Sequence, residues 1–345
     1  DLSLELQRRG HEVEVVSLQP LPPRDGKRDC IVKELEQSRI PVHSLGMTKL
    51  TPWRVFRLRE RLARFTPDVL HSHLFHANLV ARLMRGAGGD ARFVNSVHNS
   101  DKRTGKKWQF FIEKMTISRC DYITAVSTAA AGFFAKKVGM SKDQIGVVHN
   151  GIRSIESLNN AEICELRKQW GVENCSRVIG SVGYLSYQKG YDRLLNVICE
   201  LRKRIPAGEH WGVVILGEGE QRALLERESK CLQDDMTVRF PGFRTDAARC
   251  IGAFDMFVMP SRFEGFGLTL AEAMAHGVPI VASNVDSLPE LMQQYENGEC
   301  VDFNDLSTAA ERILHWASVN LRTPQLRWTV EKMVDGYEEL YRSLV

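Results

Sequence analysis

Ten short runs rich in β-branched residues recur along the chain, separated by helical patterns of about 10–15 residues. This alternation is typical of parallel sheets that are covered by helices on both faces. Ten strands are too many for one simple sheet of this kind. The runs lie at 11–18, 68–73, 92–98, 121–127, 145–149, 177–185, 211–217, 236–242, 255–261 and 279–283.

A polar segment at 149–162 divides these runs into two series of five. We therefore predict an α/β protein with two doubly wound, Rossmann-like domains, at residues 1–152 and 153–320. In such folds ligands bind at the carboxyl ends of the strands, so we expect one site in the cleft between the domains. The sequence opens with a helical pattern that leads into the first run, and we expect that a preceding first strand is missing.

Charge is distributed unevenly between the two halves of the chain. Residues 1–150 carry 25 Lys and Arg against 15 Asp and Glu, a net charge of +10, whereas residues 151–345 carry 21 against 28, a net charge of −7. The basic half includes the stretches 54–64 and 101–107. They form either solvated helix faces or a surface that meets an anionic membrane or acceptor.

Several classes of protein are excluded by what these residues lack. No apolar run approaches the roughly 18 residues of a transmembrane helix, and residues 1–18 have no signal-peptide features. The eight cysteines include no CxxC pair, which favours free thiols over disulfides or zinc. We therefore expect a cytoplasmic protein.

Two glutamates flank the glycine-broken segment EGFGLTLAE, in which Glu264 is the first residue and Glu272 the last. A strand precedes this segment, and a helix that begins near Gly267 and Leu268 follows it. The N–H groups of a helix N-terminus bind anions, and carboxylates accept hydrogen bonds from vicinal hydroxyls. The arrangement therefore suits a diphosphate with a sugar at each end, which is a nucleotide sugar.

Other candidates also follow strands. Lys189 precedes a predicted helix and is either an anion ligand or a solvated loop lysine. Gly217 lets the backbone approach a ligand or only makes a tight turn, and its GxG pattern is too weak to indicate NAD. His98 ends a strand and is a candidate ligand contact. The histidines in HSHLFHAN favour hydrogen bonding over metal, because no carboxylate or cysteine accompanies them.

Eight segments of the sequence carry a resemblance to a known family: EGFGLTLAEAMAHGVPIVAS, VVHNGI, VGYLSYQKGYDRLL, ILGEGEQRALLE, FPGF, PDVLHSHLFHANL, SVHNS and VEKMVDGYEELY. Together they resemble the retaining group 1 (family 4) glycosyltransferases of the GT-B fold over essentially the whole chain. The final helical pattern is similar to the family's helix that crosses back onto the first domain, so we assign residues 328–345 to that domain.

The resemblance implies a role for each candidate. Glu264 would accept hydrogen bonds from the donor sugar and Glu272 from the ribose, while Lys189 would neutralise the departing phosphate. His98 would contact the donor sugar from the opposite domain. The remaining donor-binding residues would be Gly183 and Tyr184 in the phosphate loop, Gly217, the backbone of Phe266, Gly267 and Leu268 at the diphosphate, and Gly242, Phe243 and Arg244 near the base.

The implied activity is transfer of a hexose-type sugar from a nucleotide-diphosphate donor to a glycan or lipid-linked acceptor, in polysaccharide or lipopolysaccharide biosynthesis. Neither a metal ion nor a cofactor is implied, and no nucleic acid. Peripheral contact with the inner face of an anionic membrane is a further expectation. A sugar-nucleotide epimerase and a phosphorylase of similar fold are more distant alternatives.

One residue departs from the family pattern. Tyr184 occupies a place where the family usually has an arginine, and Arg262 or Arg193 could substitute for that charge. This departure and the missing first strand motivate the alternative of a catalytically weak GT-B protein that binds a nucleotide sugar or a partner glycosyltransferase.

Overall fold

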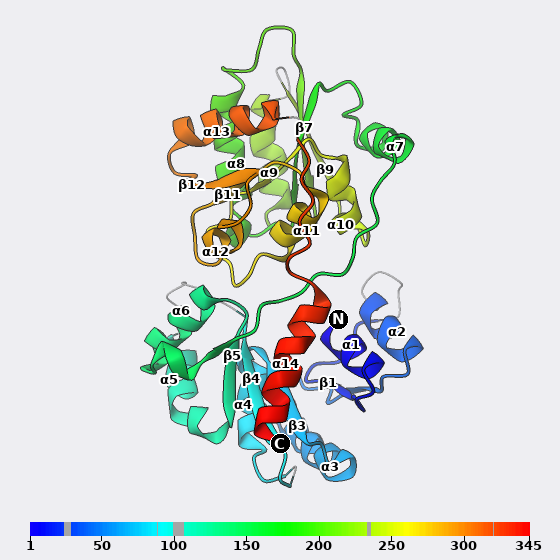
Figure 1. The fold of residues 1–345 in the computed structure, drawn as a ribbon, viewed down its shortest axis with the longest axis vertical. Coiled ribbons are helices and arrows are strands. Elements are labelled where there is room, and N and C mark those ends of the chain that lie inside the picture. The colour runs from blue at the N-terminus through cyan, green and yellow to red at the C-terminus, as the bar shows by residue number, and fades with distance from the viewer. Residues whose placement is uncertain (24–28, 88, 99–106, 233–235, 320) are drawn as a thin grey trace. The chain divides into compact units, whose positions relative to one another are not determined.

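The computed structural model describes residues 1–23, 29–87, 89–98, 107–232, 236–319 and 321–345. It divides into two compact units, of which unit 1 is Asp1–Arg153 with Trp328–Val345 and unit 2 is Ser154–Arg327 (Figure 1). Both contain parallel sheets, which confirms the predicted fold class. Residues 101–106 of the predicted basic stretch lie outside the described residues.

The sheet of unit 2 is parallel throughout and has the strand order β12-β11-β10-β7-β8-β9. The chain runs from β7 to β8 and β9 on one side, and then places β10, β11 and β12 on the other. The point at which this order reverses lies between β7 and β10. The strands are β7 (Arg177–Val182), β8 (Trp211–Leu216), β9 (Met236–Gly242), β10 (Met256–Met259), β11 (Ile280–Ser283) and β12 (Gly298–Val301).

Helices pack against both faces of this sheet. Leu194 of α8 and Ile313 of α13 join Val213 and Val258 of the strands in one buried cluster. On the opposite face the ring of Phe254 packs directly against the backbone of Gly180, where an added Cβ would lie 1.9 Å from the ring. The helices are α7 (Asn160–Trp170), α8 (Tyr191–Leu201), α9 (Arg222–Glu228), α10 (Ala247–Cys250), α11 (Leu268–His276), α12 (Leu288–Met292) and α13 (Leu306–Ser318).

Unit 1 has a four-stranded parallel sheet in the order β3-β4-β5-β6 and a separate parallel pair, β1 and β2. Its strands are β1 (Val15–Ser17), β2 (Val42–Ser44), β3 (Val69–His73), β4 (Arg92–Val97), β5 (Tyr122–Ala125) and β6 (Gly146–Val147). Its helices are α1 (Leu2–Arg8), α2 (Cys30–Gln37), α3 (Phe56–Phe65), α4 (Leu74–Leu83), α5 (Lys107–Thr116), α6 (Thr128–Val138) and α14 (Val330–Leu344).

The C-terminal helix α14 returns to unit 1 after the chain has passed through unit 2. Thr329 caps its start by accepting a hydrogen bond from the backbone N–H of Lys332. Gly151 lies against this start, because a Cβ there would be 2.2 Å from the carbonyl oxygen of Thr329. Further along, Tyr337 packs in a buried cluster with Leu6 of α1.

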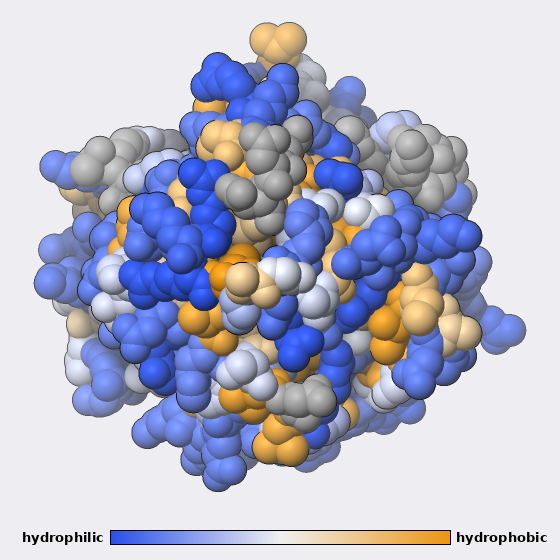
Figure 2. All heavy atoms as spheres, turned by 90° about the horizontal axis from the view of Figure 1, so that it is seen from above, coloured by the Kyte–Doolittle hydropathy of each residue, from blue (hydrophilic) through white to orange (hydrophobic). Residues whose placement is uncertain are grey.

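Each of the ten predicted runs contains a strand; β9 fills its run, and the other nine strands are shorter than theirs. Two strands, β2 and β12, were not predicted, because neither segment has an extended β-branched run. No helix among the described residues is long and apolar enough to cross a membrane. The face shown in Figure 2 is mostly hydrophilic, with hydrophobic residues in small separate patches.

Candidate functional site

An ion pair lies at the carboxyl ends of the two strands between which the order reverses. Lys189 ends a short 3₁₀ helix after β7, and Glu264 lies in the loop after β10. The Lys189 Nζ is 2.6 Å from the Glu264 Oε1, and the Ser261 hydroxyl donates to the same oxygen at 2.9 Å. The Glu264 side chain is 7% exposed. Parallel α/β sheets bind their ligands at such a reversal point.

The two segments that carry this pair are joined by hydrogen bonds. The Arg262 N–H donates to the Gln188 carbonyl at 2.7 Å, and the Gln188 side chain donates back to the Phe263 carbonyl at 3.1 Å. A Cβ on Gly190 would lie 2.3 Å from the Pro260 carbonyl oxygen. Glycine at 190 is therefore required for this contact, which holds Lys189 beside Glu264.

Helix α11 begins directly after the Glu264 loop. Gly267 precedes it with φ +101°, a conformation that favours glycine, and Leu268 is the first helical residue. N–H groups in a first helical turn have no acceptor within the helix and carry its positive partial charge. The Ser287 hydroxyl fixes the preceding backbone by donating to the Phe266 carbonyl at 2.8 Å. The segment thus has a backbone arrangement that suits an anion.

Glu272 lies one turn into α11 and is half-buried. Burial raises the pKa of its carboxyl to about 7, and the positive charge of Lys189 acts in the opposite direction. Lys189 therefore interacts with both glutamates that the sequence singled out.

Glu272 should make the stability of the protein fall as pH rises. Its folded-state pKa of about 7 exceeds the ordinary value of about 4.3, so the folded state binds more protons between these values. The resulting stabilisation is complete below about pH 4 and is lost as pH rises through 7. We expect Glu272→Gln to raise the free energy of unfolding by about 2–3 kcal/mol at pH 8 and much less at pH 5, measured by urea denaturation.

Glu200 of α8 provides the control for this measurement. Hydrogen bonds from Lys203 and Arg204 lower the pKa of its carboxyl, so Glu200→Gln should not stabilise the protein at high pH. A Glu272→Gln variant with the pH profile of the parent protein would contradict the assigned burial of this carboxylate.

Three glycines that were predicted to bind the donor lie next to one another at the ends of neighbouring strands. A Cβ on Gly183 would lie 3.3 Å from the Lys189 Cε, and a Cβ on Gly217 would lie 1.9 Å from the Gly183 carbonyl oxygen. The Gly217 N–H in turn donates to the Gly242 carbonyl at 2.9 Å. The structure therefore brings Glu264, Lys189 and these glycines together along one edge of the sheet.

Tyr184 is 60% exposed beside this group, and a hydrogen bond with Glu220 raises the pKa of its hydroxyl. Neither arginine that could replace its missing charge is free. Arg262 forms a bidentate pair with Asp192, at 2.8 and 2.6 Å. Arg193 donates to the carbonyl of Ser261 at 3.4 Å, and its pKa is lowered by burial. Both guanidinium groups are thus engaged in holding loops.

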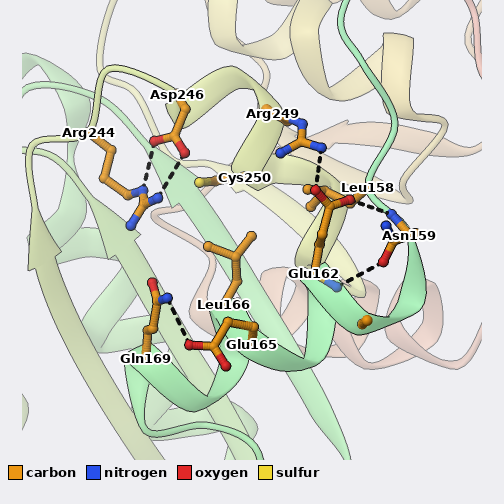
Figure 3. Close-up of a pocket in the computed structure, with 11 residues that line it drawn as sticks. Leu158, Asn159, Glu162, Glu165, Leu166, Gln169, Arg244, Asp246, Arg249 and Cys250 are labelled. Carbon is orange, nitrogen blue, oxygen red and sulfur yellow. Dashed lines mark hydrogen bonds and ion pairs between the residues drawn. The ribbon is translucent and has the colours of Figure 1, made fainter.

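Arg244 lines a cavity of about 430 Å³ between α7, α10 and the loop after β9 (Figure 3). Its guanidinium points toward Asp246 and pairs with both carboxylate oxygens at 2.8 Å. Across the cavity, Arg249 pairs with Glu162 at 2.6 Å. Phe243, which precedes Arg244, is 59% exposed. Polar groups thus line this cavity, and both of its arginines are paired with carboxylates.

His98 belongs to unit 1 and follows β4. Its Nε2 is 2.9 Å from the Nδ1 of His73, the last residue of β3, and burial lowers the pKa of His98 to about 4. His76 of the same motif is exposed and lies outside this pair. No group of three or more potential metal ligands occurs among the described residues.

Sequence reasoning missed three residues that shape the Glu264 loop. They are Ser261, which donates to its carboxylate, Ser287, which holds the Phe266 carbonyl, and Asp286, which accepts from the Glu264 N–H at 3.1 Å. Asp286 has φ +47°, a conformation that aspartate tolerates better than most residues. Its position shortly after β11, another strand end, was the signal that could have found it.

Comparison with known proteins gives a family match for each half of the chain. The family described as "Glycosyl transferases group 1" matches residues 162–326, and "Glycosyltransferase Family 4" matches residues 1–154. The O-antigen biosynthesis glycosyltransferase WclY of Escherichia coli is 28% identical over 61% of this chain and 62% of its own length. The lipopolysaccharide core biosynthesis mannosyltransferase LpsB of Rhizobium meliloti is 29% identical over 64% and 60%. The chain thus matches about three fifths of these relatives.

Among solved structures, HepE of Anabaena in complex with UDP and glucose has a TM-score of 0.76 to this chain. The match covers 96% of this chain and 100% of HepE at 20% sequence identity. The architecture is therefore the two-domain GT-B fold.

Proposed function

This chain belongs to the group 1 glycosyltransferases, and from that premise we propose that it is a retaining enzyme that transfers a hexose-type sugar from a nucleotide-diphosphate donor to a glycan or lipid-linked acceptor. The observation that carries the proposal is the buried pair of Lys189 and Glu264 beside the N-terminus of α11. It supplies a cation, an anion-binding backbone and a hydroxyl acceptor at the strand-order reversal of one sheet.

The donor would be held along this edge of unit 2. Its diphosphate would lie at the backbone of Phe266, Gly267 and Leu268, where the helix N-terminus and Lys189 offset its charge. Glu264 would accept from the sugar hydroxyls and Glu272 from the ribose. The base would lie near Gly242, Phe243 and Arg244, and His98 would contact the donor sugar. Solved HepE complexes with UDP and with UDP-glucose support a nucleotide-sugar donor.

Retention would follow from attack on the same face of the sugar that the diphosphate leaves. The departing phosphate would take the proton of the acceptor hydroxyl, and the protein would supply position and charge. Lys189 would serve as the cation at the leaving group, so the reaction would need no metal ion. Glu264 would orient the sugar, and its pairing with Lys189 would keep both groups in place before the donor arrives.

The acceptor side of the proposal depends on unit 1. Helix α5 presents Trp108, Phe111 and Met115 along one exposed face, with Lys107 and Lys114 beside them. Exposed aromatic residues flanked by lysines suit an anionic membrane interface. We therefore propose a cytoplasmic enzyme that contacts the inner face of the membrane and acts in polysaccharide or lipopolysaccharide biosynthesis, as the names of WclY and LpsB suggest.

A catalytically weak protein that binds a nucleotide sugar or a partner glycosyltransferase is the second candidate. It is favoured by Tyr184 at an expected arginine position, and by the engagement of both Arg262 and Arg193 in other contacts. Release of nucleoside diphosphate in the presence of an acceptor extract would identify the enzyme, whereas donor binding without such release would identify the binder.

A thermal-shift panel of UDP-, GDP- and ADP-sugars tests the donor site itself. At 100-fold excess over Kd a bound donor stabilises the folded state by about 2.7 kcal/mol, which raises Tm by about 4 °C for a chain of this length that unfolds as one unit. We expect one base to give this rise, and Glu264→Gln to reduce it for the sugar nucleotide but not for the nucleoside diphosphate. A flat panel would count against the donor site.

A further inference from the structure

A continuous set of partly buried polar side chains connects His98 with the C-terminal helix inside unit 1. His98 and His73 are in hydrogen-bond contact, and the ring of His73 lies against that of His71, with centroids 4.2 Å apart. The Nδ1 of His71 is 2.6 Å from the hydroxyl of Tyr341 on α14. Four aromatic side chains thus run from the carboxyl ends of β3 and β4 to the last turns of the chain.

His71 is held at both of its ring nitrogens. Its Nε2 is 2.6 Å from the Ser96 hydroxyl, which in turn lies 2.6 Å from the Thr124 hydroxyl and 3.2 Å from the Tyr337 hydroxyl. Burial lowers the pKa of His71 well below its ordinary range, so the ring is neutral and one nitrogen donates while the other accepts. The orientation of His71 is therefore fixed by β4, β5 and α14 together.

The contact between His73 and His98 restricts what His98 can offer to a ligand. Burial lowers the pKa of His73 to about 3 and of His98 to about 4, so both rings are neutral near pH 7. One ring must then donate an N–H and the other must accept. If His73 donates, the Nδ1 of His98 carries the proton; if His73 accepts, that Nδ1 has a lone pair.

We propose that His73 is a positioning residue that couples the tautomer of His98 to its own and fixes the orientation of His98, and that Tyr341 holds this pair through His71. The assignment of His98 to the donor sugar rests on the proposed function, but the positioning does not. Because a sugar hydroxyl meets either a donor or an acceptor at Nδ1, His73 decides which hydrogen bond the substrate receives. Tyr341, which lies near the end of α14, thereby influences the site.

Two variants each remove one hydrogen-bonding group and keep an aromatic ring at that position. His73→Phe deletes the hydrogen bond to His98, and Tyr341→Phe deletes the hydroxyl that faces His71. We expect the ¹⁵N chemical shifts of His98 to move from one tautomer toward a mixture, strongly in the first variant and partly in the second. With the donor identified, kcat should fall about 10²-fold and about 10-fold respectively with little change in KM, because misplacement of about 1 Å is felt in the transition state.

Tyr295→Phe is the matched control. The Tyr295 hydroxyl is also buried and makes a 2.7 Å hydrogen bond, to the Val278 carbonyl, but it lies in unit 2. This variant should lose comparable stability and leave the ¹⁵N shifts of His98 unchanged.

The two measurements separate the inference from the proposed function. Unchanged His98 shifts in His73→Phe would overturn the positioning role, whatever the activity. Changed shifts with an unaltered kcat would uphold the positioning and would count against contact between His98 and the donor sugar. Rescue of the parent shifts by His73→Gln, whose side-chain amide can both donate and accept a hydrogen bond, would support the hydrogen bond as the cause.

Discussion

Replacing Lys189 with methionine should lower kcat about 10²–10³-fold, which is the loss typical of removing one preorganised charge-stabilising group. Methionine keeps the apolar stem of lysine, so the change removes mainly the charge beside Glu264. If Lys189 acts on the departing diphosphate, its interaction strengthens as charge develops there. The loss should therefore appear in single-turnover rates and only weakly in donor affinity.

The ion pair of Lys189 and Glu264 also predicts a change in the free energy of unfolding, which is measured independently of activity. Lys189→Met leaves the Glu264 carboxylate, which is 7% exposed, without the cation that faces it. Losing one partner of a buried pair is costly, and we expect a loss of about 2 kcal/mol because Lys189 itself is partly exposed. The double variant Lys189→Met with Glu264→Gln should regain most of this stability but none of the activity, as measured by urea denaturation and donor turnover.

Asp255 provides the control. It lies at the amino end of β10, whereas Glu264 follows the carboxyl end of that strand. Asp255 pairs with Arg167 at 2.9 Å and accepts from the Val178 N–H at 2.7 Å. Asp255→Asn should reduce stability and leave kcat unchanged, because Asp255 lies at the amino ends of the parallel strands and the proposed site lies at their carboxyl ends. If Lys189→Met retained the kcat of the parent protein, the leaving-group role would be wrong.

The sequence predicted where individual strands end better than it predicted which residues lie beside those ends in space. Glu264 and Lys189 were each placed after a strand, yet nothing in the sequence shows that they touch, since they lie 75 positions apart. Their contact depends on β7 and β10 being adjacent, and strand order is a property of the whole sheet. The start of helix α11 was predicted correctly: it was placed near Gly267 and Leu268, and the helix begins at Leu268.

A long-range ion pair explains why the structure gives little support to the hypothesis that another arginine replaces the charge missing at Tyr184. Arg262 was a candidate for the charge that Tyr184 lacks, and the sequence contains no sign that Asp192 lies opposite it. Only the packing of α8 against the loop after β10 brings that carboxylate within 2.6 Å of the guanidinium. Short strands were missed for a related reason: β2 and β12 are stabilised by neighbouring strands rather than by their own composition.

Gly217→Ala should be among the most destabilising single substitutions in unit 2. Gly217 has φ +147°, and a Cβ there would lie 1.9 Å from the carbonyl oxygen of Gly183. The obstacle is backbone, so no side-chain rotation can relieve it, and the loops after β7 and β8 must separate. We expect a loss of about 3 kcal/mol from strain and overpacking together, measured by urea denaturation.

Gly208→Ala isolates the steric part of this effect. Gly208 also has a positive φ, +86°, but no atom lies within 4 Å of a Cβ built there. Alanine at 208 should therefore cost only the left-handed conformation, about 1–2 kcal/mol. The excess loss at Gly217 measures the contact between the two loops together with the additional strain of its φ of +147°.

The same pair of variants distinguishes two roles for Gly217. If glycine is needed there mainly because Gly183 is so close, separating the loops should also displace Lys189, whose side chain lies beside Gly183. Gly217→Ala should then lose the thermal shift given by a nucleotide sugar, whereas Gly208→Ala should keep it. Equal stability losses in the two variants would show instead that the loops can part freely, and that the glycine serves only the ligand.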